Sequence, residues 1–408
     1  MRSAKGAARS FRRIRNRFAP HSVLRELLKR FGLAPLGLLA LAPALFGEKW
    51  TVQYFYDEHS SKLEIVDLAF PTAQRGIAVG WTGDTTSDRK VKPTALLTND
   101  GGAHWTLSPI KDEPRSIFFL NENSGWMVTE NGIWATSEAG LNWRKLCDQP
   151  KPNPKLGPIT PGGLILRLWF VDEQHGFAVG YQKTVLKTSD GGRTWSPVAE
   201  AAKPTGNPAF TAYSRIIFDG KHGIIIGSAV PPRRDLGRFP SWMEPDRATK
   251  TRPAPTVTLL METQDGGATW GSSNSSLIGL VTTIRMVGSV GVNVFGYPES
   301  FEWPSEVFSM DLSNGKSASI FRDKNRRVFD VALFRGPAVV LGAIELPGRL
   351  NTVPIPGKVK MLSSVDLIEW KEMDVDYRAV ATTLVLAGPD RDHLWAATDT
   401  GMILHLVK

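Results

Sequence analysis

Regularly spaced arginines are the residues of this 408-residue chain with the clearest chemical potential. Arg167 and Arg215 each lie three residues before a phenylalanine in the same local pattern, and Arg115 lies four residues before another. A guanidinium group presents a planar fork of donors that matches a carboxylate. The spacing therefore suits recognition of an acidic partner, and the alternative interpretation is a set of solvated charges at strand starts. Three further arginines lie near the expected starts of later strands, namely Arg285, Arg327 and Arg378.

A second candidate binding element is the proline-rich stretch 231–255, which carries six basic and three acidic residues. Long loops on rigid scaffolds often carry recognition, and an aromatic side chain in a polar loop is a typical anchor. We therefore name Arg233, Arg234 and Trp242 as candidate partner-binding residues. The alternative interpretation is a disordered insertion without a binding role.

Motifs for catalysis and for metal or nucleotide binding are missing from the sequence. The seven histidines show no H-E-x-x-H or H-x-H spacing, and the single cysteine, Cys147, excludes a disulfide framework and a cysteine zinc site. Neither a Walker A motif nor G-x-G-x-x-G is present. We expect no catalytic residues, no metal and no cofactor. A carboxylate pair from distant segments stays open as an alternative, since such a pair leaves no local motif.

A recurring eight-residue frame, T-x-D-G-G-x-[TH]-W, predicts the strands and turns that position these residues. An aspartate followed by two glycines suits a tight turn, because the carboxylate accepts amide hydrogen bonds and glycine permits positive φ. We therefore interpret the frame as structural and expect its tryptophan to pack between sheets. The residues concerned are Asp100, Trp105, Asp190, Trp195, Asp265 and Trp270, with Trp143 and Trp370 in degenerate copies, the latter beginning at Ser363.

The repeat predicts several small antiparallel sheets. A strand, a polar turn, a glycine and a second apolar strand precede most copies of the frame. The 100 residues from Trp270 to Trp370 are long enough for two repeat units, one of which has an eroded frame near 311–316. The last unit lacks a fourth strand, and residues 49–56 supply it. This arithmetic predicts an all-β, seven-bladed β-propeller of four-stranded blades over residues 50–408, closed by pairing of the N- and C-terminal strands. An open β-solenoid is the alternative.

At these residues the chain resembles the Asp-box, or bacterial neuraminidase, repeat. With F-x5-G-[FI]-A-V-G ahead of the box, it resembles most the photosystem II stability and assembly factor family. That resemblance implies an exported propeller, found in photosynthetic organisms with relatives in other bacteria. It also implies an arginine patch that holds a membrane-protein segment. Asp67 stands at the arginine position of the first unit, so the expected ring of arginines is incomplete.

The N-terminal residues predict targeting. Residues 1–30 hold ten basic residues and one acid, which accounts for the whole net charge of +9, so the body has no bias toward nucleic acid. The uncharged run 31–47 comes next, and it reads as a signal h-region or a membrane anchor, with A-x-A at 42–44. Basic residues before the run favour export of the residues that come after it.

These observations together predict a non-catalytic protein, exported or membrane-tethered, that binds a protein or peptide segment of a membrane complex. The expected location is the periplasmic or extracytoplasmic side of a membrane. A sialidase-like glycoside hydrolase acting on extracellular glycans is the first alternative, because the Asp-box also occurs in such enzymes. An extracellular adhesin or sensor is the second.

Overall fold

The computed structural model describes residues 47–58, 60–84, 91–156, 163–230, 255–297, 301–336, 338–346 and 355–408. The chain divides into two units, Met1–Phe46 and Gly47–Lys408. The expected basic segment 1–30 and all but the last residue of the expected apolar segment 31–47 lie outside the described residues. Within the described ranges, no helix is long and apolar enough to cross a bilayer.

Five separate four-stranded antiparallel sheets make up most of the unit Gly47–Lys408. In chain order their strands are β2 (Ser61–Ala69), β3 (Gly76–Asp84), β4 (Lys92–Thr98), β5 (Thr106–Pro109); β6 (Pro114–Phe119), β7 (Gly125–Thr129), β8 (Gly132–Thr136), β9 (Arg144–Asp148); β10 (Ile165–Phe170), β11 (Gly176–Gly180), β12 (Val185–Thr188), β13 (Ser196–Pro197); β14 (Thr211–Asp219), β15 (His222–Ala229), β16 (Thr256–Thr263), β17 (Gly271–Leu277); and β18 (Leu280–Val287), β19 (Val290–Gly296), β20 (Ser305–Asp311), β21 (Lys316–Arg322). Within the described ranges, short 3-10 helices lie between sheets at η2 (Pro154–Leu156), η3 (Ala199–Ala202) and η4 (Pro208–Phe210).

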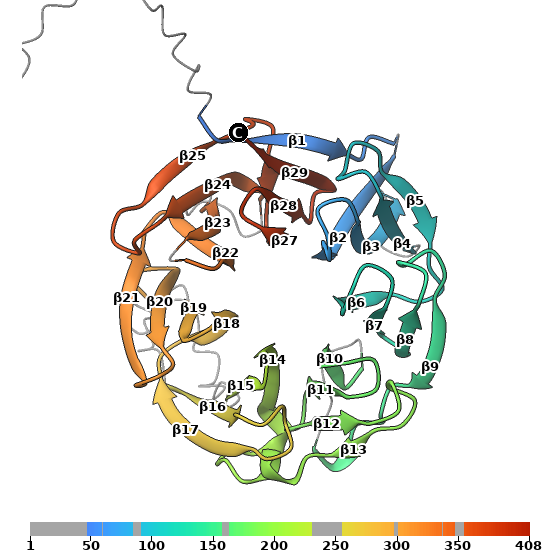
Figure 1. Ribbon diagram of the computed structural model, residues 1–408, viewed down its shortest axis with the longest axis vertical. Helices are drawn as coiled ribbons and strands as arrows, with labels where there is room; N and C mark the ends of the chain where they lie inside the picture. Colours follow the sequence, from blue (N-terminus) through green and yellow to red (C-terminus); the bar gives the residue numbers. More distant parts are fainter. Residues whose placement is uncertain are drawn as a thin grey trace, which may run out of the picture. The chain divides into compact units, whose positions relative to one another are not determined.

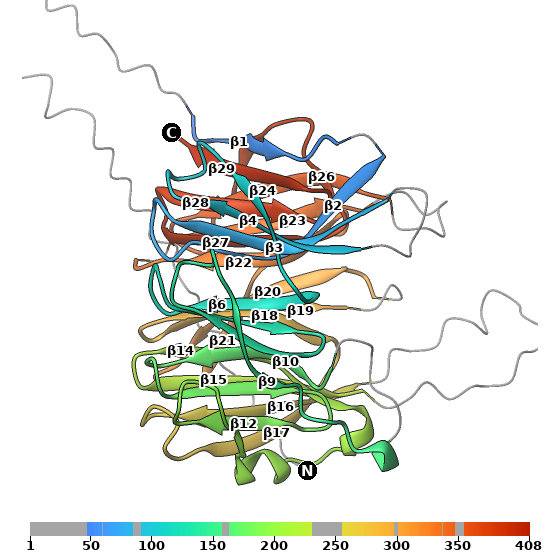
Figure 2. The ribbon, with the colours of Figure 1, turned by 90° about the vertical axis from the view of Figure 1, so that its right-hand side faces the viewer.

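The remaining strands form one larger sheet, in which the two ends of the unit meet. Its strands are β22 (Arg326–Leu333), β23 (Val339–Glu345), β24 (Gly357–Ser364), β25 (Lys371–Val375), β26 (Val380–Ala381), β27 (Leu384–Asp390), β28 (His393–Thr398), β29 (Met402–Val407) and β1 (Lys49–Phe55). β1 pairs antiparallel with β29 and parallel, over two residues, with β25. The expected pairing of the N- and C-terminal strands is therefore present, and the C-terminal end lies beside β1 in Figures 1 and 2.

The sheets are arranged around a common centre, with the first strand of each innermost (Figure 1). Successive innermost strands contact one another around the whole circuit, from β2 through β6, β10, β14, β18, β22 and β27 back to β2. This arrangement is an all-β propeller of four-stranded antiparallel sheets, as the repeat predicts. The interval between Trp270 and Trp370 does contain two units, and the eroded frame at 311–316 is the turn between β20 and β21.

Aromatic rings hold neighbouring sheets together and explain the phenylalanine–glycine spacing. Phe170 is 1% exposed and stacks on Trp126 of the preceding sheet, with ring centroids 3.7 Å apart and planes 8° apart. Its other neighbour is Gly176, where a Cβ would lie 2.7 Å from the Phe170 ring. Only glycine leaves room for the ring there. The same close approach recurs for Phe70 with Gly76, Phe119 with Gly125 and Phe218 with Gly223.

The Asp-box turns join the third and fourth strands, as expected of a structural frame. Thr98 Oγ1 donates to Asp100 Oδ1 (2.8 Å) and accepts from the Gly102 amide (2.8 Å), while the His104 amide donates to Asp100 Oδ1 (3.0 Å). Both glycines of this copy have positive φ. The box at Asp190 repeats this network, and so does the box at Asp265.

The box tryptophans pack nearly perpendicular to the inner phenylalanines. The pairs are Trp105 with Phe70, Trp143 with Phe119, Trp195 with Phe170 and Trp270 with Phe218, with centroids 5.9 to 6.1 Å apart. The last degenerate copy differs from the expected alignment. Ser364, and not Ser363, bonds to Asp366, because this copy has one residue fewer before Trp370.

Candidate functional site

A β-bulge near the start of six innermost strands defines the position from which side chains reach the centre. In each sheet, the residue after the bulge pairs with an equivalent residue of the second strand of that sheet. Arg167 pairs with Val179, and Arg215 pairs with Ile226. These two arginines do hold equivalent positions, and Asp67 holds the same one on β2. The full set is Asp67, Ser116, Arg167, Arg215, Thr283 and Asp330.

Five of these six side chains bond to the backbone of the next innermost strand. Asp67 Oδ2 accepts from the Ile117 amide (3.0 Å), and Asp330 Oδ2 accepts from the Leu386 amide (2.9 Å). The other three donate to carbonyl oxygens, Ser116 to Leu166, Thr283 to Phe329 and the Nε of Arg215 to Thr282. The position thus links five of the innermost strands, β2, β6, β14, β18 and β22, to the next one.

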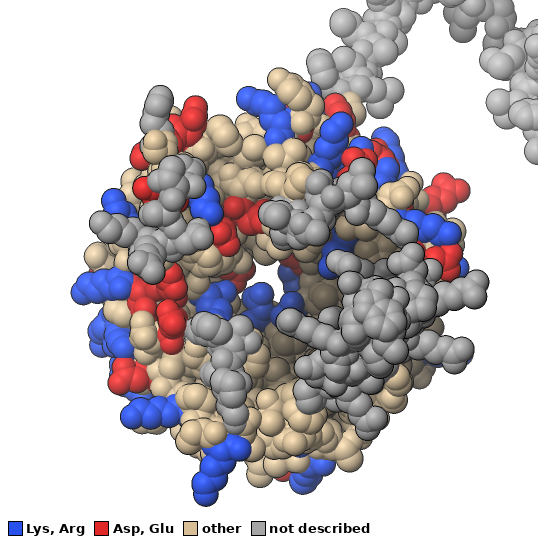
Figure 3. Space-filling view, turned by 180° about the vertical axis from the view of Figure 1, so that it is seen from behind, with Lys and Arg blue, Asp and Glu red and all other residues tan. Residues whose placement is uncertain are grey.

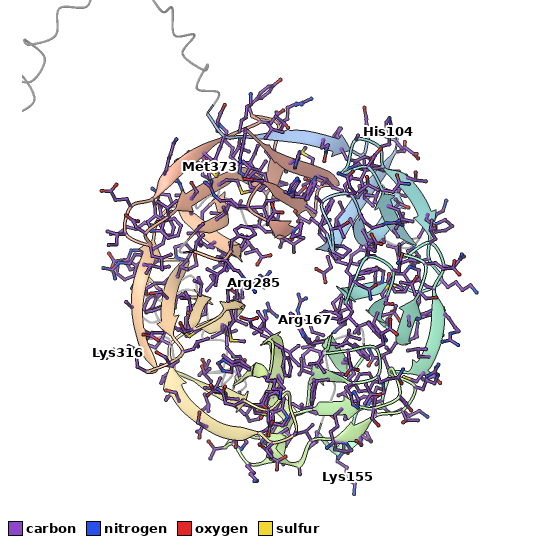
Figure 4. All side chains as sticks on the ribbon, viewed as in Figure 1. His104, Lys155, Arg167, Arg285, Lys316 and Met373 are labelled. Atoms are coloured by element: carbon purple, nitrogen blue, oxygen red, sulfur yellow. The ribbon has the colours of Figure 1, made fainter. Side chains whose placement is uncertain are left out.

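Five charged residues gather at the centre, and we call Asp67, Arg167, Arg215, Arg285 and Asp330 the channel cluster. Arg167 Nη1 lies 3.5 Å from Asp67 Oδ2, and Arg285 Nη2 lies 2.8 Å from Asp330 Oδ1. Arg167 and Arg285 come from different sheets and both point into the centre (Figure 4). Figure 3 shows basic and acidic atoms around a central opening on the opposite face. Two of the three guanidinium groups pair with the two carboxylates, which leaves the positive charge of Arg215 in excess.

Burial dominates the electrostatics of this cluster. It raises the pKa of Asp67, although Arg167 and the amides of Ile117 and Leu68 act in the opposite direction. Burial also lowers the pKa of the Arg215 guanidinium, and the positive charges of Arg167 and Arg285 lower it further. Among the described residues, Arg215 has no carboxylate within 4 Å. An added anion would therefore relieve repulsion among the three arginines.

The other arginines proposed from sequence do not share this position. Arg115 is the bulged residue itself, one place before Ser116. Arg327 lies three residues before Asp330, and its Nη2 donates to the Tyr297 carbonyl (3.2 Å). Arg285 lies two residues beyond the shared position, which still brings it to the centre.

Arg378 is a correction to the sequence alignment. It lies between β25 and β26, whereas the innermost strand of that unit begins only at Leu384. Its guanidinium group is exposed and pairs with Asp376 of the same turn at 2.7 Å. The short strand β26 comes before the innermost strand β27, so β27 begins later in the chain than the repeat spacing predicts. The residue pattern does not indicate β26. Arg233, Arg234 and Trp242 lie outside the described residues.

Sequence reasoning missed Asp330, Ser116 and Thr283. Each occupies the position of Arg167 after its own bulge, so a strict alignment of the innermost strands would have found them. For Ser116 the alignment was one residue off, and for Thr283 and Asp330 it was hidden because the glycine-flanked second strand is eroded in the later sheets. Among the described residues, no group of three or more His, Cys, Asp or Glu is placed to hold a metal ion.

A second depression lies between the β6–β9 and β10–β13 sheets, on the side of the Asp-box turns. Its volume is about 590 Å³, and its lining includes Glu138, Trp143, Glu173 and Arg193. Acidic and basic side chains are mixed there, so it has no net preference for one charge. The channel cluster remains the stronger candidate, because its charges come from separate sheets and converge.

Comparison with known proteins finds sequence similarity for one part of the chain. Residues 159–231 match the family described as photosynthesis system II assembly factor YCF48, and this stretch includes Arg167 and Arg215. The photosystem II stability/assembly factor HCF136 of Oryza sativa subsp. japonica is 42% identical over 74 residues, and that of Arabidopsis thaliana is 40% identical over 74. The matched stretch is 17% of this chain and 17% and 18% of those chloroplastic proteins.

Comparison of structures extends the likeness in fold. A structure of YCF48 bound to D1 peptide has a TM-score of 0.53 at 15% identity, covering 88% of this chain and 100% of that one. YCF48 from Cyanidioschyzon merolae has a TM-score of 0.52 at 14% identity, with coverage of 88% and 98%. An ancestral GH74 enzyme has a TM-score of 0.50 at 11% identity, with coverage of 87% and 46%.

The sequence match lies in the β10–β15 region, where the propeller carries both equivalent arginines, and the fold match extends over most of the chain. The expected resemblance is thereby confirmed: residues 159–231 resemble the photosystem II assembly factor family in sequence, and the chain shares the β-propeller fold of the YCF48 structures.

Proposed function

We propose that this protein is a non-catalytic assembly or stability factor that captures an acidic or carboxylate-bearing peptide segment at the channel cluster. The observation that carries the proposal is the convergence of Arg167, Arg215 and Arg285 at the centre, where Arg167 and Arg285 each pair with a carboxylate and Arg215 pairs with none among the described residues. One solved structure of similar fold is that of YCF48 bound to D1 peptide, which supports a peptide ligand here. A guanidinium–carboxylate pair gives orientation as well as affinity.

The bound segment would add the negative charge that the cluster lacks. Arg215 uses its Nε for the Thr282 carbonyl and its Nη1 for the Ser214 carbonyl, so its plane is held in place before a ligand arrives. A fixed donor loses little conformational freedom on binding, which favours affinity. We further propose a ring of seven blades, with β22–β25 as the sixth and β27–β29 with β1 as the seventh. We also propose an exported or membrane-tethered location, at the extracytoplasmic face.

The test is affinity purification of the full-length chain from detergent-solubilised membranes of the source cells, with crosslinking and mass spectrometry. Wild type is expected to recover one membrane complex or a precursor subunit of it. Arg167→Ala with Arg215→Ala should lose that partner by at least about tenfold, because each charge-assisted hydrogen bond contributes about 1.5–3 kcal/mol. Arg378→Ala is the matched control, since this arginine pairs only locally in the described turn. A partnerless wild type, or full recovery with the double variant, would refute the proposal.

Glycoside hydrolysis is a second candidate, and Asp67 and Asp330 are the observation that favours it. They lie in one cluster, where burial raises the pKa of Asp67 and the charge of Asp330 adds to that rise. Both carboxylates are already engaged, however, each accepting two backbone amide hydrogen bonds and facing an arginine. That arrangement favours a structural role over proton transfer. Hydrolysis of a glycan panel that is abolished by Asp67→Asn would support the enzyme.

A further inference from the structure

The outermost strand of each sheet has an edge at which another strand could pair. An open edge presents free amide and carbonyl groups to any other strand, and proteins block such edges with short strands, proline or charge. β5 and β13 have four and two residues and each contains proline. β9 carries Arg144, Lys145 and Asp148, and β25 is paired with β1.

β17 has none of these protections. It has seven residues, Gly271–Leu277, all of them exposed, and it contains no charge and no proline. Within the described part of the chain it pairs with β16 alone, and it lies on the outer rim (Figure 1). The Asn274 side chain bonds to Thr205 Oγ1 (2.7 Å), so the segment after η3 supports one face of the strand. Two other outer strands have seven residues: β21 has Lys316 and Arg322 at its ends, and β1 begins with Lys49 and pairs with β25.

The sequence of β17 is palindromic about Asn274, with residues 272–276 being S-S-N-S-S. A two-fold interface requires a surface that complements itself. We propose that β17 pairs antiparallel with β17 of a second copy of this chain, with Asn274 opposite Asn274. This register sets Ser273 opposite Ser275 and Ser272 opposite Ser276, and small hydroxyl side chains suit such cross-strand pairs.

The residues at the end of the strand fit the same register. Leu277 falls opposite Gly271 of the second copy, where no side chain competes for the space. Leu277, Ile278 and Leu280 are 37–38% exposed, although each is apolar. Burial of part of this surface would supply a hydrophobic contribution at both ends of the strand pair. The strand pair itself holds no like charges, so no charge repulsion between the two strands opposes it.

Analytical ultracentrifugation of the full-length chain in mild detergent tests the proposal. Wild type is expected to be a reversible dimer. Asn274→Lys places two lysines opposite each other and should weaken dimerisation at least about tenfold, and Asn274→Glu should do the same. An equimolar mixture of the two variants should restore the dimer. Ser317→Lys on the exposed edge of β21 is the matched control and should leave dimerisation unchanged.

Disulfide crosslinking tests the register. With Cys147→Ser removing the native thiol, Asn274→Cys should give a covalent dimer on oxidation, since directly opposed Cα atoms lie about 4.5–5.5 Å apart, within disulfide range. Ser276→Cys should not, because its own copy lies four positions away across the pair. A monomeric wild type, a dimer unaffected by Asn274→Lys, or equal crosslinking at both sites would overturn the proposal. None of these results depends on the channel arginines, so this proposal and the proposed function stand or fall separately.

Discussion

Replacement of Gly176 by alanine tests whether the phenylalanine–glycine pair holds the sheets together. The added Cβ would lie 2.7 Å from Phe170 Cδ1 and 2.8 Å from Cε1 and Cγ. Contacts under 3.0 Å force a shift, and the ring has nowhere to go, because Trp126 stacks on its other side at 3.7 Å. Overpacking of this kind costs about 1–3 kcal/mol of the free energy of unfolding.

The expected change in melting temperature follows from the size of the unit. Unfolding entropy is about 2.1 cal/mol/K per residue, so the unit Gly47–Lys408 unfolds with about 0.8 kcal/mol/K. A loss of about 2 kcal/mol then lowers the melting temperature by about 3 °C. Gly83→Ala is the control, since its Cβ would meet nothing nearer than Val91 Cγ1 at 3.8 Å. That substitution should be neutral or slightly stabilising, because alanine restricts the unfolded chain.

A double-mutant cycle with Phe170→Leu separates the clash from other effects. Phe170→Leu alone loses the stacking on Trp126 and should cost about 1–2 kcal/mol. Because leucine removes the ring atoms that Cβ would meet, the double variant should be less destabilised than the two single changes together, with a coupling of about 1 kcal/mol or more. Denaturant unfolding gives all four values. Strict additivity, or a Gly176→Ala variant as stable as Gly83→Ala, would refute the packing argument.

Three further predictions concern closure, acid stability and the inner ring. Trp50→Ala should lower the free energy of unfolding by about 3–5 kcal/mol and make the N-terminal strand sensitive to limited proteolysis, because Trp50 is fully buried between β29 and β25. Hydrogen bonds from the His104 amide and side chain and from Thr98 lower the pKa of Asp100 to about 2. The contribution of Asp100 is therefore complete above about pH 4 and is lost as the pH falls from about 4 toward 2, and Asp100→Asn should remove that slope in acid titrations of stability. Asp330→Ala should destabilise the fold by at least about 2 kcal/mol in denaturant unfolding, since it leaves the buried Leu386 amide without its acceptor, whereas Asp374→Ala on the exposed rim should change little.

Features encoded within a few residues were predictable from sequence, and features made by distant residues were not. The Asp-box fixes its own turn through Thr98, Asp100 and Gly102, so its copies announce the sheets and their spacing. The closing strand was predictable because the last unit lacked one. The ion pairs of the channel cluster join residues 100 and 45 positions apart, and bulges shift the strands by one residue before each pair forms. A one-residue shift turns a side chain to the other face of its strand, so the spacing that set Arg115 one place off the shared position did not identify Ser116 as its occupant.

The shared position after the bulge shows how one place in the fold serves both closure and binding. The two carboxylate oxygens of an aspartate at this position accept hydrogen bonds from backbone amides and an arginine, as those of Asp330 do. Few acceptor sites then remain for a ligand. A guanidinium has five N–H donors, so Arg215 can bond to the Thr282 carbonyl and still present donors to the centre. Of the two arginines at this position, Arg215 keeps the link to the next sheet while adding a charge, whereas Arg167 adds a charge and pairs with Asp67 instead. We infer that the positive charge available to a ligand comes from Arg167, Arg215 and Arg285, which confines the proposed binding to the part of the ring around β10, β14 and β18.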